Sequence, residues 1–207
     1  MKSRRYFSAL LALLCLIGTA TCPATAVSTE ADPMEAVLTE SGFPDVDEDA
    51  PYAEAVSYIS EIGVMEGDEN GYFNPDQPVT RAEMAVIICR MLGEAEVLPS
   101  ADDFSDVPQS HWANPYISKA AELQIINGYP GGRFAPSDNV TYEQAVTMVV
   151  RAVGYTEVAQ DNGGYPDGFL SVARSNGYLE NVEGQQGTLL TRANVTVLLF
   201  NYYNNNI

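Results

Sequence analysis

The chain has 207 residues, of which 46% are hydrophobic, and carries 28 acidic against 10 basic residues, for a formal net charge of -18. This length and apolar content suffice for a buried core, so a wholly disordered chain is excluded. The acidic balance argues against binding to DNA, RNA or an anionic membrane surface, because such binding depends on clustered Lys and Arg.

The N-terminal segment, up to Ala26, has the pattern of a secretory signal peptide. A basic cluster precedes an apolar run over residues 6–18, and small residues at 24–26 offer a cleavage site after Ala26. A membrane-spanning helix needs about 20 residues, so the short run favours a cleaved peptide over a retained anchor. We therefore expect a secreted protein.

Cleavage would also change the cysteine content. Cys15 and Cys22 would be removed, which leaves Cys89 without an internal disulfide partner. The remaining fold would have to be stabilised by core packing, and Cys89, which lies among apolar residues, is predicted to belong to that core. Residues 27–42 are expected to be a polar lead-in.

Two sequence markers recur in the same order along the chain. The first places Asp45, Asp106 and Asp167 at equal intervals, and the second is an apolar residue followed by Thr80, Thr141 or Thr191. The markers predict three repeats, over residues 43–93, 104–155 and 165–203. The third repeat is shorter between its two markers than the others, which we assign to a truncated loop.

Each repeat is predicted to be a helix, a turn-rich loop and a second helix. The first helices are expected over residues 52–66, 114–127 and 169–181. After each marker Thr, apolar residues recur at helical spacing and predict one buried stripe per second helix. These residues are Met84, Ile87, Ile88 and Met91, then Ala145, Met148, Val149 and Ala152, then Val195, Leu198, Leu199 and Tyr202. No repeat can bury its stripe alone, so the three stripes are expected to face one another.

The starts of the second helices resemble capping boxes. Thr80 with Glu83, and Thr141 with Gln144, have the spacing in which the two side chains satisfy each other's backbone N–H groups. The third pair ends in Asn194 and fits only in part.

Arg81 and Arg192 follow the first and third marker threonines, at the first helical position. The helix dipole already favours an anion there, and a guanidinium adds a fork suited to a carboxylate. The residues alone leave two alternatives open: a repeated anion pocket, or intramolecular salt bridges to Asp45, Asp106 or Asp167. Replacing both arginines with alanine is expected to abolish ligand binding at little cost in stability, and a large loss of stability would show that the arginines serve the fold.

Four motifs together resemble the S-layer homology (SLH) domain of bacterial surface proteins. They are Val79–Glu83, Phe104–Val107, His111–Ala113 and the loop Asn127–Pro136, and the resemblance extends over residues 43–203. It implies a mainly α fold in which three helix-loop-helix SLH repeats form a pseudo-threefold bundle with projecting loops. It also implies non-covalent binding to acidic, often pyruvylated, secondary cell-wall polysaccharide in grooves between repeats.

The resemblance implies roles for individual residues. Arg81 and Arg192 would pair with the carboxylate of the glycan, and Trp112 would supply an apolar face for a sugar ring. Asp45, Asp106 and Asp167 would line the grooves or orient the arginines, with Glu83 of the same marker beside them. Tyr142 stands where the family has Arg, so one groove would lack its cation, and one or two working grooves are expected.

The sequence lacks residues that several other functions, such as calcium binding or catalysis, would require. An EF-hand loop starting at Asp68 would need Gly at position 73 and Glu at position 79, where Phe73 and Val79 stand. His111 is the only histidine, so His-based metal sites and a Ser-His-Asp triad are not predicted. No cofactor is predicted, and small repeats disfavour a glycan-active enzyme. Assembly with other surface-layer proteins through the Tyr-rich loops remains the alternative function.

Overall fold

The computed structural model describes residues 42–94 and 103–206. Within these residues the chain forms helices and no sheet, which confirms the predicted mainly α class. The expected signal peptide (1–26) and nearly all of the expected lead-in (27–42) lie outside the described residues. None of the described helices combines the length and apolar character that a membrane span requires.

The helices form three successive pairs, each with an outer and a central member. The elements are α1 (Ala53–Glu61), α2 (Arg81–Met91), α3 (Asn114–Glu122), α4 (Tyr142–Ala152), α5 (Thr156–Asp161), α6 (Asp167–Ser175) and α7 (Arg192–Asn206). Pair 1 is α1 with α2, pair 2 is α3 with α4, and pair 3 is α6 with α7. The additional helix α5 precedes pair 3.

The outer helices are shorter than the sequence pattern predicted. They end at Glu61, Glu122 and Ser175, because the chain turns into the left-handed region shortly afterwards. After α1, Gly63 has a φ of 72°, and the N–H of Val64 returns to the carbonyl of Ile59 at 3.1 Å. This Schellman arrangement satisfies the last carbonyls of the helix and directs the following apolar residues into the core.

The central helices begin at the residues predicted from the capping signals. Glu83 Oε2 accepts the N–H of Thr80 at 2.7 Å, and Thr80 Oγ1 accepts the N–H of Glu83 at 3.2 Å, which completes the box at α2. Before α4, the N–H of Thr141 donates to Gln144 Oε1 at 3.1 Å. At α7, Asn194 instead donates its amide to its marker threonine, since its side chain is one carbon shorter.

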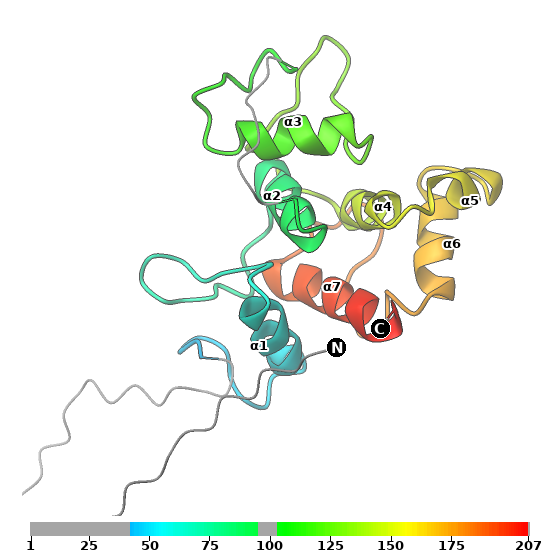
Figure 1. Ribbon diagram of the computed structural model, residues 1–207. Helices are drawn as coiled ribbons and strands as arrows, with labels where there is room; N and C mark the ends of the chain where they lie inside the picture. The colour runs from blue at the N-terminus through cyan, green and yellow to red at the C-terminus, as the bar shows by residue number, and fades with distance from the viewer. Residues whose placement is uncertain (1–41, 95–102, 207) are drawn as a thin grey trace, which may run out of the picture. The chain divides into compact units, whose positions relative to one another are not determined.

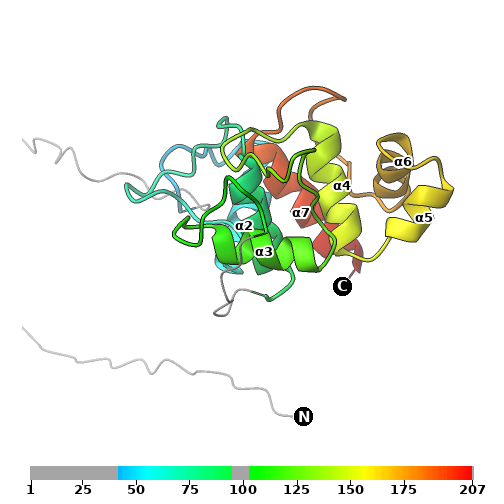
Figure 2. The same ribbon diagram turned by 90° about the horizontal axis from the view of Figure 1, so that it is seen from above.

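The outer helix of each pair packs on the central helix of the preceding pair. Figures 1 and 2 show α3 against α2, α6 against α4, and α1 against α7, so the arrangement runs around the molecule and returns to its start. The central helix α4 also contacts α2 and α7. The predicted stripes are buried in this core, with Met84, Ile88 and Leu198 fully enclosed, and Cys89 belongs to the same cluster. Ala152 and Tyr202 are only partly buried at its margin.

The segments that lead into the central helices form a closed ring of backbone hydrogen bonds. The N–H of Val79 donates to Leu190 at 3.0 Å, that of Leu190 to Val140 at 3.1 Å, and that of Val140 back to Val79 at 2.9 Å. Just after these positions, the first residues of α2, α4 and α7 donate to the loops of neighbouring pairs in the opposite rotational order. These bonds give the molecule an approximate threefold axis.

Pair 3 departs from the other two in where it is shortened. Its outer and central helices begin at Asp167 and Arg192. The number of residues between these two starts is only slightly smaller than in pairs 1 and 2. The step from the start of α3 at Asn114 to the start of α6 at Asp167 is clearly shorter than the step from the start of α1 at Ala53 to the start of α3. The loss therefore lies mainly before α6 and only slightly in the loop after it, which corrects the expected truncated loop. Helix α5 occupies the segment before α6.

Gly168 allows α6 to approach α5. A Cβ at this position would collide with the backbone carbonyl oxygen of Ala159, which belongs to the helix and cannot rotate away. We expect Gly168→Ala to lower the free energy of unfolding by about 2 kcal/mol, because backbone must shift in a packed core. Urea unfolding measures this loss. Ser171→Ala, on the exposed side of the same helix, is the control and should be within about 0.5 kcal/mol of the parent; equal effects of the two would contradict the packing argument.

Candidate functional site: grooves between helix pairs

Arg81 and Arg192 occupy equivalent places at the first residues of α2 and α7. Arg81 Nε donates to the backbone oxygen of Phe134 at 2.8 Å, and its Nη2 donates to that of Asn127 at 3.0 Å. Arg192 makes the same two bonds, both at 2.6 Å, to the corresponding carbonyls in the loop of pair 1. Each arginine therefore fastens a central helix to the loop of the next pair.

The Arg81 guanidinium is largely enclosed. The residue is 7% exposed, and its guanidinium carbon lies 4.5 Å from the ring centre of Phe134 and 4.8 Å from that of Tyr129. Burial lowers the pKa of Arg81, as it does that of Arg192, yet a guanidinium remains protonated at physiological pH. Both residues are thus permanent cations set between helix pairs.

Asp45 and Asp106 each hold a loop by two backbone N–H groups. The carboxylate of Asp106 accepts from Phe134 at 2.7 Å and Ala135 at 2.8 Å, and Asp45 holds the equivalent two residues of pair 1 at 2.8 and 2.6 Å. Desolvation alone would raise the pKa of Asp106, but these N–H bonds and Arg133 outweigh it and lower that pKa. Both aspartates shape loops.

The part of the chain that the structure describes does not contain the intramolecular salt bridges that one of the two sequence alternatives predicted. Among the described residues, Arg81 and Arg192 form no ion pair with Asp45, Asp106 or Asp167. Instead, an aspartate and an arginine from different pairs hold one loop residue: Phe134 donates its N–H to Asp106 and accepts from Arg81 through its carbonyl.

Asp167 does not occupy the place that its spacing suggested. It is the first residue of α6, whereas Asp45 and Asp106 lie well before the outer helices that begin at Ala53 and Asn114. Its carboxylate accepts from the Gln186 side chain at 3.0 Å. Counting from the start of the outer helix, the position equivalent to Asp106 in pair 3 is the buried Ala159 of α5.

Tyr142 replaces the third arginine and fills space. It is the first residue of α4, is buried, and a Cβ at Gly184 would lie 2.8 Å from its ring. In the other two loops, Phe73 and Phe134 lie against the guanidinium of an arginine. In pair 3, Tyr142 packed on Gly184 replaces this arginine–phenylalanine contact. Burial raises the pKa of the Tyr142 hydroxyl, which remains neutral.

The first groove contains three of the predicted site residues. We call it the Trp112 groove; its cavity of about 170 Å³ is lined by Val64, Met65, Glu66, Gly67, Glu83, Val86, Ile87, Arg90, Trp112 and Arg192. Trp112 is 62% exposed and stacks on His111. An exposed ring beside a guanidinium suits a ligand that has both an apolar face and a negative charge.

A second groove repeats the first around the threefold axis. We call it the Tyr165 groove; its cavity of about 230 Å³ is lined by Arg81, Ile125, Ile126, Asn127, Gln144, Thr147, Met148, Arg151 and Tyr165. Glu66, Glu83, Val86 and Arg90 of the Trp112 groove correspond, one repeat later, to Asn127, Gln144, Thr147 and Arg151. Tyr165 stands just before α6, as Trp112 stands just before α3, and is 52% exposed.

The third groove lacks a cation. The Pro51 groove has a cavity of about 320 Å³, lined by Pro51, Tyr52, Asp76, Asn181, Glu183, Thr191, Ala193, Asn194 and Val197. Pro51 takes the place of the aromatic wall, and Tyr142 is not part of the lining. Two carboxylates without a basic residue make this groove a poor receptor for an anion.

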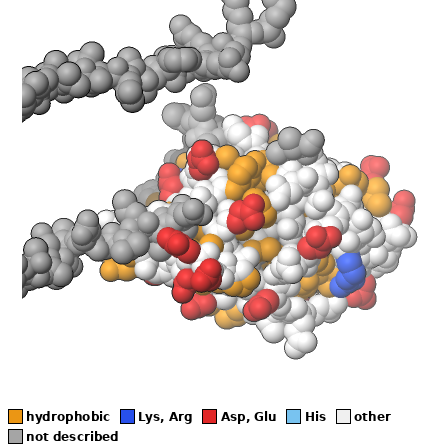
Figure 3. Space-filling view, turned by 90° about the horizontal axis from the view of Figure 1, so that it is seen from below, with side chains coloured by type: hydrophobic (Ala, Val, Ile, Leu, Met, Phe, Trp, Pro, Cys, Tyr) orange, Lys and Arg blue, Asp and Glu red, His pale blue; other side chains and the backbone are white. Residues whose placement is uncertain are grey.

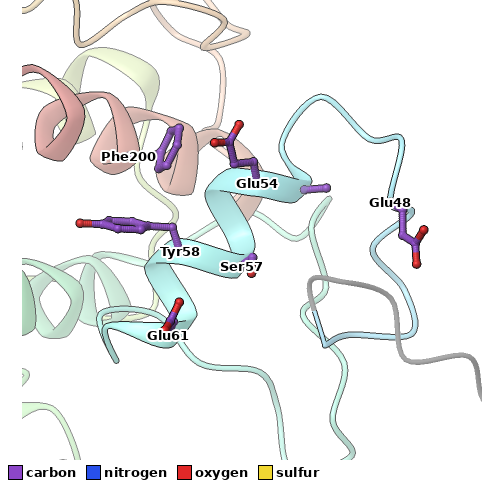
Figure 4. A pocket seen from close by; sticks show the side chains of 7 residues that line it. Glu48, Glu54, Ser57, Tyr58, Glu61 and Phe200 are labelled. Atoms are coloured by element: carbon purple, nitrogen blue, oxygen red, sulfur yellow. The ribbon is translucent and has the colours of Figure 1, made fainter. Parts of the chain in front are cut away.

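A further hollow, between α1 and α7, is acidic. In Figure 4, Tyr58 and Phe200 lie between the two helices, with Glu54 and Glu61 along α1 and Glu48 on the preceding loop. Figure 3 shows acidic side chains scattered over one face of the molecule, with little basic surface between them. Among the described residues, no cluster of His, Cys, Asp and Glu could hold a metal ion.

Tyr165, Arg151 and Thr147 are groove residues that the sequence analysis did not identify. The equal spacing of the marker aspartates assigned Tyr165 to the position of Phe104, inside a loop. Alignment on the start of the outer helix would have matched Tyr165 with Trp112. The same alignment would have identified Arg151 and Thr147. These residues line the groove from α4 as Arg90 and Val86 line the other groove from α2.

The fold defines a protein built from related helix pairs with clefts between them, and two of these pairs match a known domain family. Residues 42–85 and 103–146 match the S-layer homology domain. These two segments include α1 and α3 and end within α2 and α4.

Several relatives of this chain are bacterial proteins named for the cell surface or the cell wall. It is 34% identical over 161 residues to a cell surface protein of Thermoanaerobacter kivui, covering 76% of this chain and 20% of that protein. It is 32% identical over 128 residues to the middle cell wall protein of Brevibacillus brevis, covering 60% and 12%. It is also 34% identical over 90 residues to the cellulosome-anchoring protein of Acetivibrio thermocellus, covering 42% and 20%. The chain therefore spans a fifth or less of these relatives.

Proposed function

We propose that the chain is a non-catalytic module that anchors to the bacterial cell wall by binding acidic, pyruvylated secondary polysaccharide in its grooves. One observation carries the proposal: two grooves related by the threefold axis each combine an arginine at a helix start with an exposed aromatic ring. The ring offers a surface for a sugar, and the guanidinium offers a partner for a carboxylate. The names of the relatives support a location at the cell surface.

We also propose that pair 3 is a divergent third repeat of the same family, which completes the module. Its helices take the positions that the threefold axis requires, its marker residues close the backbone ring, and it contributes Arg192 to the Trp112 groove and Tyr165 to the other. Both grooves would thus be incomplete without it.

Binding to isolated cell walls tests the proposal. Purified protein should be retained on sacculi of Brevibacillus brevis and should be released when the secondary polysaccharide has been chemically removed from the same sacculi. Sacculi stripped only of protein serve as the matched control and should retain the protein fully. Undiminished retention on walls without the polysaccharide would overturn the glycan model.

Assembly with other surface proteins is the second candidate. Tyr72 and Tyr129, in two equivalent loops, are both more than 40% exposed, and exposed tyrosines are common in protein interfaces. Retention that survives removal of the polysaccharide but is abolished by removal of wall-associated protein would favour this function.

A further inference from the structure

The two arginine-containing grooves differ in charge, although their geometry is the same. Each lining has two guanidiniums, but the Trp112 groove also contains Glu66 and Glu83, whereas the Tyr165 groove contains no carboxylate. We infer that the Tyr165 groove is the primary receptor for an acidic sugar, and that Asn127, Gln144 and Thr147 determine this preference. The inference rests on the proposed function and specifies which groove performs it.

Asn127 leaves the charge of Arg151 uncompensated. In the Trp112 groove, the equivalent Arg90 forms an ion pair with Glu66, with Nη1 2.9 Å from Oε2. In the Tyr165 groove, with the Asn127 amide turned to satisfy both groups, its oxygen accepts from Arg151 Nη1 at 3.0 Å. The backbone oxygen of Asn127 also holds Arg81 Nη2 at 3.0 Å, so one neutral residue positions both cations.

Gln144 removes the second carboxylate. It and Glu83 are the third residues of their helices and cap their marker threonines in the same way, so the helix start does not require the charge. Glu83 acts electrostatically on Arg192, whereas Gln144 places a neutral amide at the equivalent position. An incoming carboxylate would therefore meet a negative side chain in one groove only.

Acidic residues near the Tyr165 groove are engaged elsewhere or lie outside its lining. The carboxylate of Glu143 acts electrostatically on Tyr165, but it lies outside the lining and accepts the N–H of Gly187 at 2.8 Å. Asp106 holds two loop N–H groups, and it and Asp138 act on Arg81 from beyond the lining. Arg192 in the other groove is similarly influenced by Asp45 and Asp68, so these outer charges do not distinguish the two grooves.

Thr147 places a hydroxyl group at a position where the other two grooves have a valine. Val86 and Val197 occupy its position in the Trp112 and Pro51 grooves. Thr147 is 5% exposed, and its hydroxyl has no hydrogen-bond partner among the described residues. A threonine in a helix has two favourable rotamers, so the hydroxyl can turn toward the groove. It would there contact an oxygen of the sugar near the two guanidiniums.

The single tryptophan makes the two grooves separately observable. Trp112 is the only tryptophan in the chain and belongs to one groove, so its fluorescence reports occupancy of that groove alone. The probe is a monosaccharide glycoside that carries a pyruvate ketal, with the same glycoside lacking the ketal as control. Calorimetry of the purified protein should detect binding at concentrations about tenfold below those that change Trp112 fluorescence, because carboxylates near the anion weaken binding in the Trp112 groove.

Exchanging the charged and neutral residues should exchange the behaviour of the grooves. Gln144→Glu should weaken the tight calorimetric event about tenfold and leave the Trp112 response unchanged. Glu83→Gln should move the Trp112 response to about tenfold lower concentrations. Each variant keeps a capping side chain at its helix start. Thr147→Val should weaken the tight event and leave stability equal or higher, since it removes a buried unpaired hydroxyl.

The outcomes separate this inference from the proposed function. If Trp112 fluorescence saturates together with the tight event, or if neither Gln144→Glu nor Thr147→Val affects that event, the assignment to the Tyr165 groove is wrong although glycan binding stands. If the ketal glycoside does not bind while sacculi still retain the protein through their polysaccharide, the carboxylate chemistry inferred for the groove is wrong. If neither the glycoside nor the polysaccharide is bound, both proposals fail.

Discussion

Replacing Arg81 with alanine should lower the free energy of unfolding by about 4 kcal/mol, because the change leaves two carbonyls without their charged donor and empties an enclosed site. The change removes the hydrogen bonds to the backbone oxygens of Phe134 and Asn127. It also removes the contacts of the guanidinium with the rings of Phe134 and Tyr129. The structure therefore opposes the expectation from sequence that the marker arginines can be removed at little cost. Urea unfolding monitored by circular dichroism measures the effect.

Arg133→Ala is the matched control for this loss. Arg133 lies in the same loop region, is largely exposed, and has its Nε 3.6 Å from Asp106, so its removal should cost less than about 1 kcal/mol. A loss below about 1 kcal/mol for Arg81→Ala would mean that its guanidinium contributes little to the fold, and would restore a purely ligand-binding role. Loss of glycan binding by Arg81→Ala identifies a ligand contact only if it is measured well below the unfolding transition.

Asp106→Ala should lower the free energy of unfolding by about 3 kcal/mol, because its carboxylate accepts two consecutive N–H groups and alanine leaves both without an acceptor. The two donors are Phe134 and Ala135. Ala135 has a φ of 59°, a backbone conformation that alanine rarely adopts, so the carboxylate also maintains an unfavourable turn. Asp106→Asn retains one good acceptor and should lose less.

The same contacts predict a dependence on pH. The pKa of Asp106 is lowered in the folded protein, so the stability it contributes is present above the unfolded value of about 3.9 and is lost as the pH falls through the folded value. The difference in stability between the parent protein and Asp106→Asn should therefore shrink as the pH is lowered from about 6 to about 3. A difference that does not change over this range would contradict the carboxylate role.

The sequence predicted the central helices better than it predicted the site. Thr80 and Thr141 marked helix starts because capping is a local property, and the apolar stripes marked the buried faces because their spacing is also local. The ends of the outer helices were missed. Gln124 at a φ of 58° gives no sequence signal after α3, whereas Gly63 and Gly177 mark the ends of α1 and α6 but were predicted to lie within the helices.

The roles of the charged residues depended on contacts between distant segments. Arg81 meets carbonyls 46 and 53 residues away, and Arg192 meets carbonyls 119 and 126 residues away, so their partners could not be found from local spacing. Tyr165 was misplaced because the equal spacing of Asp167 concealed the shorter segment between the starts of α3 and α6. Only the structure aligned the starts of α3 and α6.

The backbone ring around Val79, Val140 and Leu190 has a topological consequence. Each of these residues offers the ring one donor and one acceptor, and each finds both partners within the set. A stacked solenoid leaves its ends unsatisfied and can grow by adding units. Here each of the three residues already has both partners, so a further helix pair could join the ring only if one of these bonds were broken.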